Sequence, residues 1–191
     1  MKRWALIAAM VLGIGLTGCS NLSEKDLADL QNPNDTVKKH AIEKVSSEGR
    51  MPLSLANRLS FNRIMEKRAV DIMVGQLKKG KESEDIQLSI LRALGNLGRR
   101  VTVPVAVLVE RLDDENPEIR VQAVESLGKI GNKEAVPALV DLLEKEPNKY
   151  PIIWALGEIG DKSAVPALNK LLSSDDKYLK YNANKALGKI R

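Results

Sequence analysis

Residues 119–131 have the sequence IRVQAVESLGKIG, and this stretch decides the fold because it recurs along the chain. Residues 86–98, IQLSILRALGNLG, carry the same pattern 33 positions earlier. The end of the pattern returns as WALGEIG at 154–160, 29 positions later, and as ALGKI at 186–190. Self-similarity at a period near 30 residues indicates a protein built from stacked structural repeats.

A second unit follows each full copy of the first. AVPALVDLL at 135–143 recurs as AVPALNKLL at 164–172, and a looser version begins at Val103. A degenerate copy of the first unit spans 37–49, with a counterpart of the second unit at 69–77. The chain therefore alternates two kinds of short segment.

Both units are predicted to be α-helices. Apolar residues of the first unit fall at helical spacing and form one stripe, made of Ile119, Ala123, Val124, Leu127 and Ile130. Asn116 and Pro117 supply an N-cap and a proline at the first helical position, and Gly131 ends the helix. Two helices per period of about 30 residues predict a helical solenoid.

These residues resemble the HEAT repeat, in the short form found in phycobilisome-lyase-like proteins. Residues 84–191 match that pattern well, whereas 22–83 match it poorly. The resemblance implies an all-α, HEAT-like helical-repeat solenoid (an α-α superhelix) whose second helices line the concave side. Expected core positions are Leu94, Val124, Leu127, Leu139, Leu143, Leu156, Leu168 and Leu187. Expected partner-binding positions on the second helices are Glu110, Asp141 and Lys170, with Val109, Val140 and Asn169 beside them.

The N-terminal residues predict an exported protein. Lys2 and Arg3 precede an apolar run over 5–16, which is the pattern of a secretory signal. Residues 16–19, LTGC, resemble the lipobox of bacterial lipoproteins. That resemblance implies a signal peptide at 1–18, cleavage before Cys19, and a diacylglyceryl group on its sulfur. The alternative is an ordinary secretory signal that ends near a cysteine. The absence of aspartate after Cys19 favours the outer membrane over the inner one.

The region before the regular repeats is expected to have two parts. Residues 19–34 would hold the lipid anchor and an N-terminal capping helix, with Ser23 and Asp26 at capping-box spacing. Residues 35–83 would form the degenerate first repeat with an insert at about 50–67. The insert region is rich in methionine and in basic residues, among them Arg58, Arg63, Lys67 and Arg68. These basic residues either bind a partner or are the solvated side of a packed helix.

Trp154 departs from the repeat pattern. Its position in the other copies holds charged residues, namely Glu43, Arg92, Glu125 and Lys185. If the register holds, Trp154 is exposed near Tyr150 and is a candidate binding residue. If this shorter copy has slipped in register, the indole instead fills the core.

Composition excludes several functions. The chain has one cysteine and one histidine, so it lacks the ligands for a cysteine- or histidine-rich metal site. Without Lys2 and Arg3, 28 basic residues face 25 acidic ones, and a net charge of +3 does not favour nucleic acid. We expect no metal, cofactor or small-molecule substrate and no catalysis. The sequence favours a protein-binding scaffold for an envelope partner; the alternative is a lyase-like enzyme or cofactor chaperone related to bilin lyases.

Cys19→Ser is expected to prevent lipid labelling of the full chain and to abolish processing at this site, because serine has no thiol to form the thioether. Metabolic labelling with a fatty acid and the mass of the N-terminal peptide measure both effects. Normal cleavage and membrane retention of the variant would refute the lipoprotein interpretation.

Overall fold

The computed structural model describes residues 22–47, 56–98 and 100–190, apart from the side chains of residue 47 and of 56–63. Within these ranges every regular element is helical and no strand occurs, which confirms the predicted all-α solenoid. The predicted signal peptide, Cys19 and residues 50–55 of the predicted insert lie outside the described residues.

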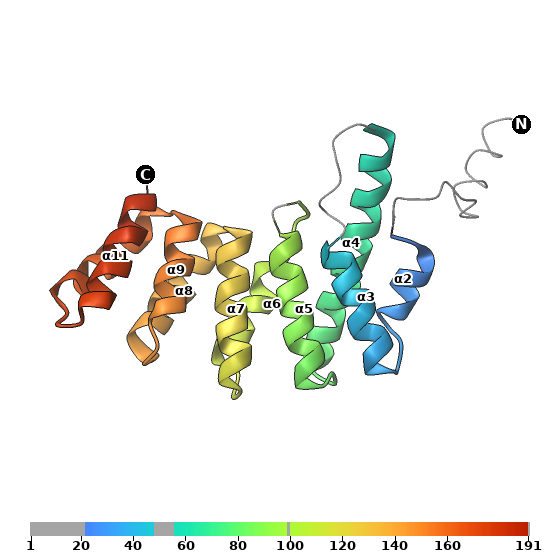
Figure 1. Ribbon diagram of the computed structural model, residues 1–191, viewed down its shortest axis with the longest axis horizontal. Coiled ribbons are helices and arrows are strands. Elements are labelled where there is room, and N and C mark those ends of the chain that lie inside the picture. The colour runs from blue at the N-terminus through green and yellow to red at the C-terminus, as the bar shows by residue number, and fades with distance from the viewer. Residues whose placement is uncertain (1–21, 48–55, 99, 191) are drawn as a thin grey trace, which may run out of the picture.

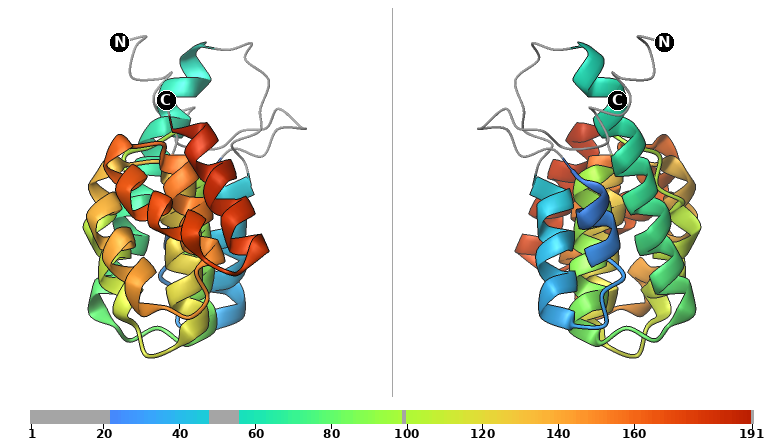
Figure 2. Two further views of the ribbon diagram at one scale, coloured as in Figure 1. Left: turned by 90° about the vertical axis from the view of Figure 1, so that its left-hand side faces the viewer. Right: turned by 90° about the vertical axis from the view of Figure 1, so that its right-hand side faces the viewer.

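The helices alternate between two layers (Figures 1 and 2). One layer holds the first helices α3 (Asp35–Ser47), α5 (Glu84–Leu97), α7 (Pro117–Ile130), α9 (Tyr150–Ile159) and α11 (Lys177–Lys189). The other holds the second helices α4 (Ala56–Lys79), α6 (Val105–Val109), α8 (Val136–Lys145) and α10 (Val165–Lys170). Short 3₁₀ turns adjoin them: η2 (Glu110–Asp113), η3 (Lys133–Ala135), η4 (Lys162–Ala164) and η5 (Leu171–Ser173). Helix α2 (Glu24–Asp29) packs on α3 and α4 at one end.

Local capping explains where the helices begin and end. The Asn116 side chain accepts a hydrogen bond from the Glu118 amide, and Pro117 occupies the first turn of α7. Gly131 ends that helix at φ +73°, a left-handed conformation that costs glycine no Cβ strain. Asn132 and Asp161 cap the two following 3₁₀ turns in the same way. The repeat boundaries are therefore encoded by the residues next to them.

Helix α2 carries the capping box expected from Ser23 and Asp26. Lys44 of α3 also donates to Asp26 over 2.7 Å, which ties the two helices together. Partial burial alone would raise the pKa of the Asp26 carboxyl, but the hydrogen bonds from Lys44 and Ser23 outweigh it and hold that pKa below its usual value. The ionised cap is therefore part of the fold at neutral pH.

Adjacent first helices touch backbone to backbone through glycine. A Cβ added to Gly95 would lie 2.9 Å from the Cα of Ser126, and one on Gly128 would lie 2.8 Å from the Cα of Ala155. Gly157 faces Ala186 in the same way, at 3.0 Å. Each repeat contains a small residue followed by leucine and glycine. The glycine of one first helix packs against the small residue of the next first helix, which is Ser126, Ala155 or Ala186. We call this row of contacts the glycine ladder.

The glycine ladder distinguishes the two layers of helices. First helices pack closely along their length, whereas α6, α8 and α10 pack far less against one another. We call the exposed side of the first helices the inner face and that of the second helices the outer face. Glu110, Asp141 and Lys170, which were predicted to bind a partner, belong to the outer face.

The core runs continuously between the two layers. Seven of the eight expected core leucine and valine positions are buried, and Leu187 on α11 is only half-buried. The difference follows from position, because α11 has no described helix packed on its far side. Accordingly, nothing lies within 4 Å of a Cβ added to Gly188, the α11 counterpart of Gly128.

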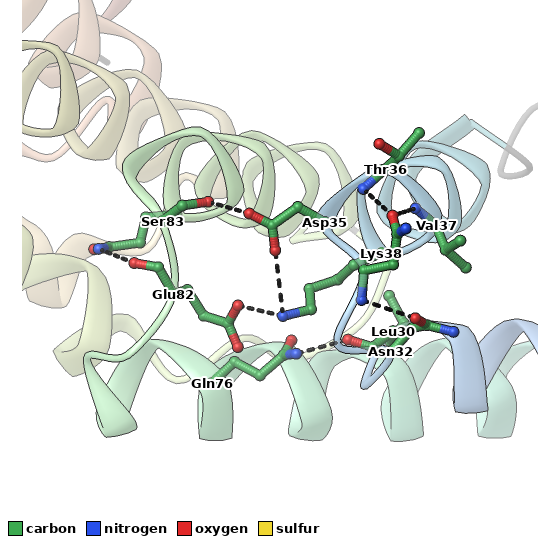
Figure 3. A network of polar contacts seen from close by, with 11 residues as sticks. Leu30, Asn32, Asp35, Thr36, Val37, Lys38, Gln76, Glu82 and Ser83 are labelled. Atoms are coloured by element: carbon green, nitrogen blue, oxygen red, sulfur yellow. Dashed lines mark hydrogen bonds and ion pairs between the residues drawn. The ribbon is translucent and has the colours of Figure 1, made fainter.

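A polar network joins the degenerate first repeat to α2 (Figure 3). The Lys38 ammonium is buried beside the Glu82 carboxylate, with Asp35 at 4.0 Å, and Gln76 donates to the Leu30 carbonyl over 2.6 Å. Residues 56–67 of the predicted insert form the first half of α4 and continue into it without a break. The N-terminal region is therefore a variant repeat whose second helix is unusually long.

Replacing Gly128 by alanine tests the glycine ladder, with Gly188→Ala as the matched control at the same repeat position. Alanine favours a helix by about 1 kcal/mol over glycine, but overpacking a tight contact costs about 1–3 kcal/mol. Gly128→Ala is thus expected to lower the free energy of unfolding, and Gly188→Ala to leave it unchanged or raise it slightly. Urea denaturation of both variants measures this; equal effects would contradict close packing at Gly128.

Candidate functional site

The repeat register places equivalent residues side by side on the inner face. Two rows of residues cross the helices when positions are counted from the equivalent apolar residue of each first helix, namely Val45, Leu94, Leu127, Leu156 and Leu187. The row six residues earlier contains Lys39, Leu88, Val121, Tyr150 and Tyr181. The row two residues earlier contains Glu43, Arg92, Glu125, Trp154 and Lys185. Because residues four apart lie on one face of a helix, the two rows are adjacent.

Exposed apolar side chains concentrate on this face. Eight large hydrophobic residues are exposed within the described part of the chain, and five of them lie on the inner face of α7, α9 and α11. These five are Val121, Tyr150, Trp154, Tyr178 and Tyr181. Single exposed apolar residues are ordinary, but a group on adjacent helices marks a contact surface. We call this group, which consists of four aromatic residues and Val121, the aromatic band.

Trp154 sits at the centre of the aromatic band and is 39% exposed. Its ring atom Cζ3 lies 2.8 Å from the position that a Cβ on Gly128 would occupy. The indole therefore rests against the glycine of the preceding repeat, while part of the residue is exposed to solvent. The register of the shorter repeat holds, and the alternative in which Trp154 fills the core is wrong.

Tyr150 is fixed by its hydroxyl. The Tyr150 OH donates to Oδ2 of Asp176 over 3.0 Å, while Oδ1 of Asp176 accepts the amides of Tyr178 and Leu179 at the start of α11. The carboxylate raises the pKa of Tyr150, and the Leu179 amide together with the Tyr150 hydroxyl lowers the pKa of Asp176. The capping of α11 thus also orients an exposed aromatic ring.

Two shallow depressions continue the inner face toward α3. The first lies between α3 and α5 and is lined by four carboxylates, Asp35, Glu43, Glu84 and Asp85, with Lys39 and His40 as its basic or titratable neighbours. The second lies between α5 and α7 and includes Leu88, Arg92 and Val121. Arg92 is held there by a hydrogen bond from its Nε to Oε1 of Gln122, at 3.3 Å. The inner face is therefore hollowed from α3 to α7.

The other residues predicted for partner binding are not brought together with Trp154. Glu110, Asp141 and Lys170 are exposed on the outer face, where Lys170 lies 3.4 Å from Glu144.

The predicted basic residues of the insert belong to α4, also in the outer layer. Lys67 forms an ion pair with Asp71 at 3.2 Å, and Arg68 forms one with Glu24 of α2. Arg58 and Arg63 lie on α4, but their side chains are outside the described set. Sequence reasoning missed Leu88 and Val121, although the repeat alignment places both at the position of Tyr150.

The described residues offer neither a metal site nor a membrane-spanning helix. No group of three or more histidine, cysteine, aspartate or glutamate side chains there could hold a metal ion. None of the described helices is long and apolar enough to cross a membrane.

Comparison with known families places the chain. The family model for HEAT repeats matches residues 70–152 and 149–191, so the chain belongs to the HEAT-repeat family. A comparison with curated protein sequences found no match.

Solved structures share the fold. The complex of CpcE and CpcF of phycocyanin lyase from a Nostoc species aligns with a TM-score of 0.65 and 23% identity, covering 92% of this chain and 67% of that one. A designed armadillo repeat protein in complex with the peptide (KR)4 aligns with a TM-score of 0.64 and 20% identity, covering 87% and 80%. An engineered protein aligns with a TM-score of 0.60 and 23% identity, covering 86% of this chain and 77% of that one. At these identities the likeness concerns the fold alone.

Tryptophan fluorescence of a Trp4→Phe variant is expected to report an accessible ring, because Trp154 is then the only tryptophan. We expect emission to be quenched by acrylamide and partly by iodide, and to red-shift little on unfolding. Emission that is blue-shifted and resistant to iodide would place the ring in the core and remove Trp154 from the site.

Proposed function

We propose that this protein is a lipid-anchored scaffold of the bacterial cell envelope that binds another protein on its inner face and has no catalytic activity. The aromatic band carries the proposal, because tryptophan and tyrosine dominate the energetics of protein interfaces. Such rings bury a large area while losing little side-chain entropy.

The solenoid supplies a preformed surface for this purpose. Backbone contacts at Gly95, Gly128 and Gly157 fix the spacing of the first helices. A rigid surface loses less conformational entropy when a partner binds, which raises affinity for the same contacts. The proposal therefore requires no change of shape on binding.

The anchor rests on the lipobox-like residues 16–19. Only two residues separate Cys19 from Leu22, which is buried in the core beside α2. A lipid on Cys19 would therefore hold the α2 end of the solenoid close to a bilayer. One acyl chain binds a membrane only marginally, but the two chains of a diacylglyceryl group, at about 0.8 kcal/mol per buried CH₂, give stable anchoring. We propose the outer membrane as the site. A bilin-lyase-like enzyme or cofactor chaperone remains the alternative, and it would rest on a likeness of fold alone.

A photo-crosslinking amino acid at position 154, compared with one at position 172, tests the proposed surface in intact cells. Leu172 is also 39% exposed, but it lies in η5 and outside the aromatic band. We expect one defined envelope protein to be crosslinked from position 154 and not from position 172.

Trp154→Glu is then expected to weaken binding of that protein by about 2 kcal/mol or more, the scale of an interface hot spot. Leu172→Glu serves as the control and should change binding by less than about 0.5 kcal/mol. Both variants should unfold within about 1 kcal/mol of the parent chain, since both positions are surface-exposed. Equal losses of binding would show that the inner face is not the binding surface.

A further inference from the structure

The inner face carries opposite charges at its two ends. At the α3 end, the depression between α3 and α5 contains four carboxylates and one lysine besides His40, a formal net charge of −3. Two of the four carboxylates are paired, because Lys39 lies 3.6 Å from Asp85 and Lys38 lies 4.0 Å from Asp35. Glu43 makes no ion pair within the described residues and is exposed. This end would attract a cation.

The α11 end is basic. Helix α11 contains four lysines, Lys177, Lys180, Lys185 and Lys189, and no acidic residue. Lys189 is paired with Glu158, and the nearby Asp176 is occupied by its cap and by Tyr150. Lys177, Lys180 and Lys185 are exposed and form no ion pair with another described residue. This end would attract an anion.

Between the two ends lies the apolar part of the inner face. Leu88, Val121, Tyr150 and Tyr181 form one row across four helices, with Trp154 beside it. Charged groups on this stretch are confined to the α5 and α7 part, while α9 contributes only aromatic side chains to the two rows. The order along the face is therefore acidic, apolar and basic.

We propose that the inner face binds a partner segment whose charge pattern is the complement: basic at the α3–α5 end, apolar in the middle and acidic at the α11 end. The proposal deepens the scaffold function above and rests on it. Complementary charges would fix which way the segment lies, while the aromatic band supplies most of the affinity.

The spacing of the helices sets the length of the segment. Packed helices are about 8–10 Å apart, so the stretch from α5 to α11 covers roughly 24–30 Å. An extended chain rises about 3.3 Å per residue and covers that distance in about seven to nine residues. A peptide of about twelve residues therefore reaches both charged ends.

Four labelled twelve-residue peptides with one alternating apolar centre test the proposal by fluorescence anisotropy with the full chain. The bipolar peptide has lysine residues at one end and glutamate residues at the other. The charged residues of the other peptides are lysine only or glutamate only, and the last peptide has serine in their place. We expect the bipolar peptide to bind about tenfold more tightly than the serine-ended one at low salt, and the advantage to shrink at high salt. Equal affinity of these two peptides, tighter binding of a single-charge peptide, or binding of none would overturn the proposal.

Charge-reversal variants assign the ends. Lys177→Glu combined with Lys185→Glu should weaken the bipolar and glutamate-ended peptides several-fold and spare the serine-ended one. Glu43→Lys should do the same for the bipolar and lysine-ended peptides. The matched control, Lys145→Glu with Lys170→Glu, makes the same change of charge on α8 and α10 and should alter none of them. An equal effect of the control would attribute the result to net charge and contradict the assignment.

Trp154→Glu separates this proposal from the proposed function. If it weakens every peptide while the bipolar and serine-ended peptides bind the parent chain equally, the binding face stands and the charge pattern is wrong. If Trp154→Glu changes the binding of no peptide, the inner face itself is the wrong surface and both proposals fail.

Discussion

The fold depends on one contact, in which the glycine of one repeat receives the small residue of the next. At Gly128 the neighbouring backbone leaves no space for even a methyl group. Close approach of the first helices then follows, and with it the fixed spacing of the residues on the inner face. At Gly95 the small residue of the next helix is the polar Ser126. The Ser126 hydroxyl donates a hydrogen bond to the Leu91 carbonyl over 2.8 Å, and the residue is fully buried. A serine there keeps the small volume and satisfies its own hydroxyl.

The same contact explains the place of Trp154. Ring atom Cζ3 lies against Gly128, where a larger residue would stand in the way, so the indole remains partly exposed without entering the core. At the aligned position of the preceding repeat, Glu125 is half-buried. The ladder therefore tolerates a charged or an aromatic side chain at this row, and the row can vary without loss of the fold.

Local signals in the sequence predicted much of this structure. The caps at Asn116 and Asp161 and the stop at Gly131 depend only on neighbouring residues, and the repeat period predicted the solenoid. The close spacing of the first helices could not be predicted in the same way, because it depends on contacts between residues about 30 positions apart. Arg68 could not be assigned for a similar reason, since its partner Glu24 is 44 positions away. The aromatic band could be predicted only in part. Trp154 departs from the charged residues at its repeat position, whereas Val121 does not differ from an ordinary apolar residue of a helix.

The difference between the two layers also determines how the solenoid can deform. First helices are joined at backbone contacts that resist compression, whereas the second helices are spaced by side chains and loops. A change in the spacing of the second helices is therefore easier than a change in the spacing of the first helices. The distances between equivalent residues on the inner face are the most rigid dimension of the molecule. A partner would meet contacts at a fixed spacing even where the outer layer deforms.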